Sequence, residues 1–278
     1  MHRPAREAFF LEAQGGGRFC LATHPVGPPK GAVLFVGPFA EELNKSRRMV
    51  ALAARAFASA GWMVLQLDCY GCGDSAGEFG EADWATWVGD VGLGRRWLSD
   101  WLQMQGRDLP LVLWGLRAGS LLIADHLATE PGARLLLWQP VTNGKQHLTQ
   151  FLRLKAASEM LAESDAKTAM TRVKAALQAG ETVEVAGYAV RAALASGMEA
   201  AMLRLPSGGT PSVEIVEVGA EGGSVSPAVA VLGERWREEG IRVGMQAHSG
   251  PAFWNTQEIE TVPGVIEASL AALERLRS

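Results

Sequence analysis

The chain has 278 residues, 48% of them hydrophobic, and a formal net charge of −4 at pH 7. This length suffices for one large hydrophobic core with a small insertion, and the weak acidity without a basic block excludes a typical nucleic-acid-binding surface. Three cysteines indicate a reducing compartment, and neither a signal-peptide core in Met1 to Gly17 nor a membrane-spanning stretch of roughly 20 apolar residues is found, so we expect a cytoplasmic protein without membrane insertion.

The first half of the chain alternates between apolar runs with strand character and segments with helical spacing. We predict, in chain order, a β-hairpin of strands 8–12 and 18–24, strand 32–36, helix 46–60, strand 62–68, helix 84–102, strand 111–114, helix 118–128 and strand 134–138. Strands that alternate with helices in this way predict a parallel sheet with right-handed crossovers.

The alternation stops at residues 139–141 and resumes after residue 203. Between them we predict helices 148–163, 166–179 and 187–203, which together form a helical cap insertion over residues 142–203. The cap is expected above the carboxyl-terminal edge of the sheet, where open α/β folds bind ligands. Residues 1–141 and 204–278 then form the core, the second part with strand 212–218, helix 227–239, strand 241–246 and helix 265–277.

The segment Gly115-Leu116-Arg117-Ala118-Gly119 connects a predicted strand to a predicted helix. This is the frame of the nucleophile elbow, G-x-S-x-G, in which the central side chain is lifted above the sheet. The frame predicts an α/β-hydrolase fold with a mostly parallel sheet flanked by helices. The central residue here is Arg117, which has no nucleophilic oxygen and stays protonated.

A serine hydrolase would need a histidine and a carboxylate later in the chain. His248 follows the last predicted strand, Glu217 lies at the end of the strand before it, and Glu221 follows that strand. These three residues are therefore the candidate acid–base residues; the alternative for His248 is an ordinary polar loop residue. Without a hydroxyl at position 117, such a pair has no obvious group to activate.

The segment from Gly37 to Arg48 follows the first buried strand, where α/β-hydrolases place an oxyanion-hole donor. Because Pro38 has no N–H, the candidate donors are the amides of Phe39 and Ala118. A guanidinium in a partly closed site needs an anionic partner, so we predict that Glu41 or Glu42 pairs with Arg117. The alternative is that both carboxylates lie on a solvated helix N-terminus.

The glycine-rich segment Asp68–Gly77 allows three interpretations. A dinucleotide fingerprint is disfavoured because its third glycine comes one place late, and a zinc or redox pair of Cys69 and Cys72 is disfavoured because no second pair exists. The preferred interpretation is a structural turn near the pocket. Cys72 and Ser75 remain alternative nucleophiles, whereas Ser120 lies past the elbow, and no metal or cofactor is expected.

Five motifs together resemble the exosortase A system-associated hydrolase 2 family. They are the segments 37–49, 71–75, 115–119, 137–141 and 250–254, the last reading Gly-Pro-Ala-Phe-Trp. The resemblance spans most of the chain. It implies an α/β-hydrolase fold and a bacterial setting near genes for PEP-CTERM protein sorting and exopolysaccharide production.

Three functions follow as hypotheses. The first is hydrolysis or acyl transfer on an ester or thioester, with a displaced nucleophile or activated water. The second is a pseudo-hydrolase that binds an anionic ligand or a protein partner around Arg117, since a cation beside a helix N-terminus favours anions. The third is a scaffold in a sorting or polysaccharide complex. The surroundings of Arg117 discriminate between ligand binding and a purely structural role.

Overall fold

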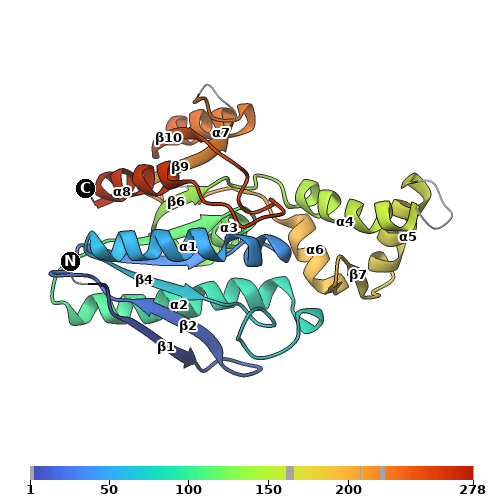
Figure 1. The fold of residues 1–278 in the computed structure, drawn as a ribbon, viewed down its shortest axis with the longest axis horizontal. Helices are drawn as coiled ribbons and strands as arrows, with labels where there is room; N and C mark the ends of the chain where they lie inside the picture. Colours follow the sequence, from blue (N-terminus) through green and yellow to red (C-terminus); the bar gives the residue numbers. More distant parts are fainter. Residues whose placement is uncertain (1–2, 161–165, 207, 220–222, 278) are drawn as a thin grey trace.

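The computed structural model describes residues 3–160, 166–206, 208–219 and 223–277. Its central feature is an eight-stranded sheet in the order β1-β2-β4-β3-β5-β6-β9-β10 (Figure 1). The pairs β1–β2 and β2–β4 are antiparallel, and all pairs from β4 to β10 are parallel. The strands are β1 (Arg6–Leu11), β2 (Arg18–Thr23), β3 (Gly31–Val36), β4 (Trp62–Leu67), β5 (Leu111–Leu116), β6 (Arg134–Trp138), β9 (Ser212–Gly219) and β10 (Arg242–Ser249).

Helices cover both faces of the sheet. One face packs against α1 (Glu41–Ser59) and α8 (Pro263–Arg277), and the other against α2 (Trp84–Met104), α3 (Gly119–Thr129) and α7 (Pro227–Glu238). Two hydrophobic clusters therefore form, one on each face. All six residues of β3 are buried, which explains why its sequence is a continuous apolar run rather than an alternating one.

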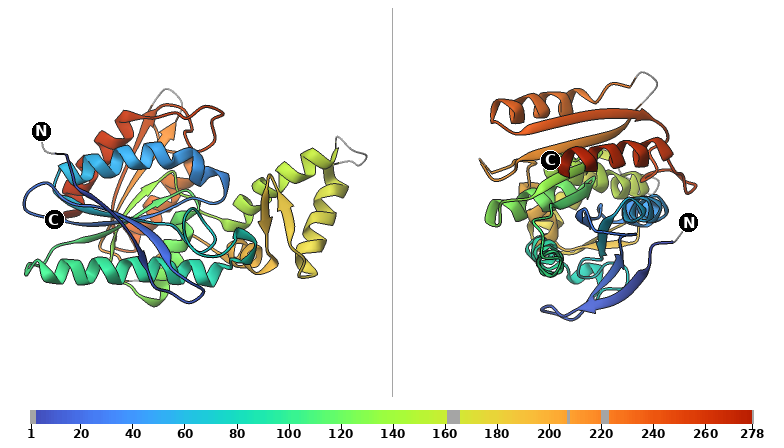
Figure 2. Two further views of the ribbon diagram at one scale, coloured as in Figure 1. Left: turned by 60° about the horizontal axis from the view of Figure 1, so that its bottom comes forward. Right: turned by 90° about the vertical axis from the view of Figure 1, so that its left-hand side faces the viewer.

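The chain between β6 and β9 projects from one end of the sheet, as Figure 1 and the left view of Figure 2 show. It holds α4 (Gly144–Met160), α5 (Ala166–Gln178), β7 (Val183–Val185), β8 (Tyr188–Val190) and α6 (Ala192–Ala200). The prediction of a helix over 187–203 was wrong in its first part, where β8 pairs with β7. Ala186 and Gly187 connect the two strands with φ values of 49° and 84°, as a two-residue hairpin turn requires. Residues 161–163 of the first predicted cap helix lie outside the described residues.

Two element boundaries matter for the site. Helix α1 begins at Glu41, five residues before the predicted start at residue 46, so both candidate carboxylates lie in its first turn. Strand β10 continues to Ser249, so His248 lies inside the last strand and not in the loop after it, contrary to prediction. In the described part of the chain no helix has both the length and the apolar character needed to cross a membrane.

Candidate functional site

Close backbone packing fixes the elbow between β5 and α3. A Cβ atom on Gly119 would lie 2.2 Å from the carbonyl oxygen of Val36, and one on Gly115 would lie 2.8 Å from Cδ1 of Ile123. Gly119 is therefore required by contact with the backbone at the end of β3, whereas at Gly115 the closest atom is the end of a side chain. Arg117 itself has a φ of 53°, and its amide donates to the carbonyl of Trp138 at 3.0 Å, which fixes the turn against the end of β6.

The Arg117 side chain is held on two sides. Its Nε donates to Oε1 of Glu42 at 3.2 Å, with both side chains 19% exposed, and its guanidinium carbon lies 5.3 Å from the centre of the Trp254 ring. Of the two predicted partners, Glu42 makes the ion pair. Glu41 instead accepts a hydrogen bond of 2.9 Å from the hydroxyl of Tyr188 in β8. The two Nη groups of Arg117 donate to no described residue.

His147 on α4 approaches the same ion pair. Its Nε2 lies 4.0 Å from Oε2 of Glu42, which is too long for a direct hydrogen bond. Burial and the nearby Arg117 charge lower the pKa of His147 to about 4, so the imidazole is neutral at pH 7. Burial raises the pKa of Glu42, against the opposing effect of Arg117. His147 was not predicted; its signal in the sequence is a position four residues before Phe151, on the same helix face.

We expect His147 to make the protein less stable in acid. The unfolded chain takes up this proton near the ordinary pKa of 6.5 and the folded chain only near 4. Between these values the unfolded state binds more protons, so stability falls as the pH decreases, by about 3 kcal/mol for a fully realised shift. Guanidinium chloride unfolding at pH 7.5 and 4.5 measures this loss. It should be smaller in His147→Gln; an equal loss in both proteins would contradict the assignment.

A cavity of about 380 Å³ lies over Arg117, between the core and the projecting segment. We call it the Arg117 pocket. The core contributes the ends of β3 and β5, the start of α1 and the loop before α8, and the projecting segment contributes α4 and the β7–β8 turn. The lining residues are Phe39, Glu41, Glu42, Lys45, Arg117, His147, Gln150, Phe151, Leu154, Ala186, Trp254 and Asn255. The pocket thus combines two cations and two carboxylates with an apolar wall.

Phe39 joins the pocket to the helices around it. Its ring packs edge-on against Phe151 of α4 at 5.0 Å and against Phe79 at 5.6 Å, and it lies 5.9 Å from Trp87 of α2. Aromatic contacts of this kind stabilise by about 0.5–1.5 kcal/mol each beyond their buried area. The apolar wall is therefore rigid on the core side and shared with α4.

Three non-glycine residues with strained backbone lie near the carboxyl-terminal edge of the sheet. Ala40 has a φ of 53°, as does Arg117, and Gln139 has a φ of 42°. These residues follow the carboxyl ends of β3, β5 and β6, which are neighbouring strands. A non-glycine residue in this region costs on the order of 1–3 kcal/mol and persists only where the surroundings impose it. Such a cluster of outliers supports a ligand site at this edge of the sheet.

The predicted acid–base residues do not come together. Residues 217 and 247 are paired across β9 and β10, as are 218 and 248, so Glu217 and His248 point to opposite faces of the sheet. The Glu217 carboxylate accepts from the amide of Ser226 at 2.5 Å, whereas His248 lies beside Gly264 of α8. Glu221 lies outside the described residues. Among the described residues no carboxylate contacts His248.

The alternative nucleophiles Ser75, Ser120 and Cys72 are either hydrogen-bonded to the backbone or held as protonated thiols. The Ser75 hydroxyl donates to the carbonyl of Asp68 at 2.5 Å and accepts from the amide of Phe19 at 2.8 Å. The hydroxyl of Ser120, which is fully buried, donates to the carbonyl of Arg117 at 2.7 Å. Burial raises the pKa of the Cys72 thiol to about 12, so its reactive thiolate is scarce at pH 7. The surroundings of these three residues therefore favour a structural role over nucleophilic attack.

The two candidate oxyanion donors line a second, much smaller space. Phe39 and Ala118 both border a cavity of about 20 Å³ between the elbow and the segment 68–72. That volume is close to that of one water molecule. No group of three or more histidine, cysteine or acidic side chains in the described residues could hold a metal ion.

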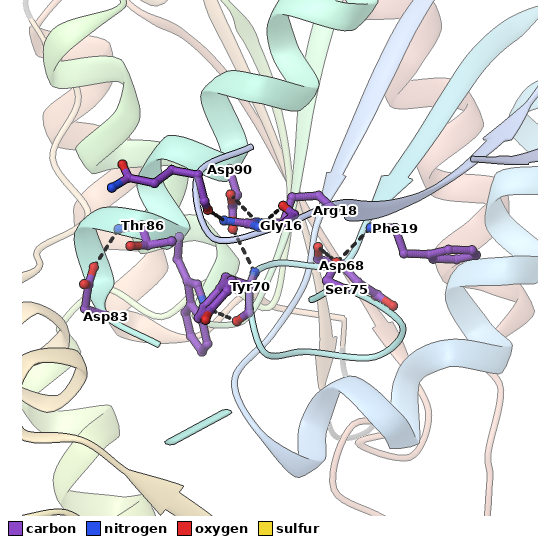
Figure 3. Close-up of polar contacts among 11 residues, drawn as sticks. Gly16, Arg18, Phe19, Asp68, Tyr70, Ser75, Asp83, Thr86 and Asp90 are labelled. Carbon is purple, nitrogen blue, oxygen red and sulfur yellow. Dashed lines mark hydrogen bonds and ion pairs between the residues drawn. The ribbon is translucent and has the colours of Figure 1, made fainter. Parts of the chain in front are cut away.

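A buried ion pair anchors the glycine-rich turn beside this cavity (Figure 3). Arg18 of β2 donates from Nε to Asp90 of α2 at 2.8 Å, with side chains 1% and 4% exposed. The second carboxylate oxygen of Asp90 accepts from the amide of Tyr70 at 2.8 Å, and Arg18 also donates to the carbonyl of Gly16 at 2.7 Å. The network joins the β1–β2 turn, the turn 68–77 and α2, as the preferred structural interpretation of that turn requires.

Structural comparison places this arrangement among known folds. A thermostable carboxyl esterase from Bacillus coagulans is 17% identical over 99% of both chains, with a TM-score of 0.61. Est1E from Butyrivibrio proteoclasticus, solved with ferulic acid, is 15% identical over 98% of this chain and 100% of its own, with a TM-score of 0.67. A Xanthomonas campestris α/β serine hydrolase without a lid is 16% identical over 97% and 94%, with a TM-score of 0.56.

This chain has the α/β-hydrolase fold. The expected fold class is thereby confirmed. No family model and no curated protein sequence matches the chain. Arg117 follows β5 directly and lies in the short connection between β5 and α3.

Proposed function

We propose that this protein is a non-catalytic α/β-hydrolase-fold protein that binds a small organic anion in the Arg117 pocket. The observation that carries the proposal is the guanidinium of Arg117, which lines a cavity of about 380 Å³. Its Nε donates to Glu42, but its two Nη groups donate to no described residue. The hydroxyls of Ser75 and Ser120 are hydrogen-bonded to backbone carbonyls, and burial raises the pKa of the Cys72 thiol. A fixed guanidinium is a strong, directional ligand for a carboxylate or phosphate.

The surroundings of Arg117 favour a carboxylate with an apolar part. Glu42 and Trp254 hold the guanidinium in place, so little side-chain freedom is lost when an anion binds. Phe39, Phe151 and Leu154 line the same cavity and provide contact for a hydrocarbon or aryl group. Small-molecule sites have this composition, with a mostly apolar wall and a few convergent polar groups.

A second candidate is hydrolysis or acyl transfer on an ester or thioester by activated water. It is favoured by one observation, the position of the Phe39 and Ala118 residues around the small cavity beside the elbow. Two amides so placed could stabilise an oxyanion. We further propose, from the family resemblance, that the protein works in the cytoplasm in a sorting or exopolysaccharide system, where a protein partner could contact the projecting segment.

Titration calorimetry with 3-phenylpropanoate and with its neutral amide tests the binding proposal. We expect the acid to bind at least tenfold more tightly than the amide, because the amide cannot form a charge-assisted pair with Arg117. Arg117→Gln should remove that difference, whereas Arg235→Gln on the exposed face of α7 should not. Equal binding of acid and amide would exclude the proposal. Saturable turnover of a p-nitrophenyl ester by the wild type would favour the second candidate.

A further inference from the structure

Glu42, which lines the Arg117 pocket, has one carboxylate oxygen that the described residues leave unsatisfied. Oε2 of Glu42 is buried and accepts no hydrogen bond from the described residues, although Oε1 of the same carboxylate is bound by Arg117. A buried carboxylate oxygen without a donor is unfavourable by about 1–3 kcal/mol or more. Native proteins satisfy nearly all such atoms, so this one needs an explanation.

The neighbouring groups do not satisfy this atom. His147 is the only other ionisable group placed near it by a described contact, and its Nε2 is 4.0 Å away. Its imidazole is neutral at pH 7 because its pKa is lowered to about 4, so it supplies no positive charge to the carboxylate. Two neighbouring groups therefore have no partner among the described residues. The Nη groups of Arg117 can bind an anion, and Oε2 of Glu42 can accept a hydrogen bond.

We infer that the ligand of the Arg117 pocket is a hydroxy acid, with a hydroxyl group on the carbon next to its carboxylate. This inference rests on the proposed function. The carboxylate binds Arg117, the hydroxyl donates to Oε2 of Glu42, and the apolar remainder contacts Phe39 and Phe151. One ligand of this class supplies both partners at once, because its two groups are one carbon apart and Arg117 and Glu42 are already in contact.

A hydroxyl avoids the like-charge contact that an ammonium group would make beside Arg117. Lys45 lines the cavity as a second cation beside Arg117. Of the two carboxylates, Glu42 is paired with Arg117 and Glu41 accepts from Tyr188 and Asn44. An ammonium group bound to Glu42 would lie beside the Arg117 guanidinium, which already pairs with that carboxylate, and the two like charges would repel. A hydroxyl adds no charge at this position.

Three acids with one skeleton test this inference: 3-phenylpropanoate, phenyllactate as both enantiomers, and phenylalanine. They differ only in carrying a hydrogen, a hydroxyl or an ammonium group on the carbon next to the carboxylate. Calorimetry on the wild type should give one enantiomer of phenyllactate an affinity at least tenfold higher than that of 3-phenylpropanoate, because a hydrogen bond to a charged acceptor has about that effect.

Variants locate the effect at Glu42. Glu42→Met removes the acceptor while keeping a side chain of similar length. The ratio of the affinity for phenyllactate to that for 3-phenylpropanoate should therefore fall close to one. Glu42→Gln keeps a neutral group there and should reduce the preference, which provides a second test if the methionine variant does not fold. Glu234→Met, on the exposed face of α7, should leave the preference unchanged.

The outcomes separate the two proposals. Equal affinities for phenyllactate and 3-phenylpropanoate, both lost in Arg117→Gln, would overturn the hydroxy-acid inference and leave the anion-binding function standing. Tightest binding of phenylalanine would overturn it in favour of an amino acid. Binding of none of the three acids would overturn the proposed function itself. A hydroxyl preference that persists unchanged in both Glu42 variants would also overturn the inference.

Discussion

Asp90→Ala should destabilise the protein by about 3–5 kcal/mol, as is usual when one partner of a buried ion pair is removed. The substitution leaves the Arg18 guanidinium, whose side chain is 1% exposed, without its carboxylate. It also removes the acceptor for the amide of Tyr70. Chemical denaturation of the wild type and the variant measures the difference, provided that both unfold in a single transition.

Two controls show whether burial and pairing cause that loss. Glu234→Ala breaks the exposed pair between Glu234 and Arg237 on α7, whose side chains are 67% and 39% exposed, and should change stability by no more than about 0.5 kcal/mol. The double variant Arg18→Met, Asp90→Leu removes both charges and should be more stable than Asp90→Ala. If Asp90→Ala and Glu234→Ala had equal effects, the buried pair would not be a stability determinant.

The order of the core elements could be predicted because local patterns determine it. Runs such as 32–36 and 135–138 are apolar throughout, and a segment with helical spacing follows each of them, so strands buried on both faces follow directly. The hairpin β7–β8 was missed because its strands have three residues each, which is too short for a period to be recognised. The start of α1 at Glu41 was missed because Ala40, the residue before it, offers no side-chain cap.

The candidate site was only partly predictable, for a different reason. The short segment 115–119 identified Arg117 as the central residue of the elbow. Because a guanidinium needs an anionic partner, the neighbouring carboxylates Glu41 and Glu42 could be named as its candidate partners. His147 comes from α4, and its approach to Glu42 depends on how the projecting segment packs on the core. The prediction for His248 depended on where a strand ends. The strand ends three residues later than predicted, at Ser249, and the His248 side chain lies beside α8.

Gly119→Ala should destabilise the protein by about 3 kcal/mol, the upper part of the range for an overpacked site. The new Cβ would lie 2.2 Å from the carbonyl oxygen of Val36 and 2.8 Å from that of Gly37. Both atoms are backbone at the end of β3, so no side-chain rotation relieves the contact. The elbow and the segment beginning at Gly37 would have to separate, which also moves Arg117 relative to Glu42 and should weaken anion binding.

Gly89→Ala is the matched control for that substitution. Gly89 lies inside α2, and a Cβ atom there would meet nothing within 4 Å. The same chemical change should therefore stabilise the protein by about 0.5–1 kcal/mol, because glycine is the poorer residue in a helix interior. Opposite signs for the two variants in denaturant unfolding would show that contact, and not the loss of a glycine, governs position 119. A stable Gly119→Ala protein with unchanged anion binding would contradict the close packing on which the geometry of the Arg117 pocket depends.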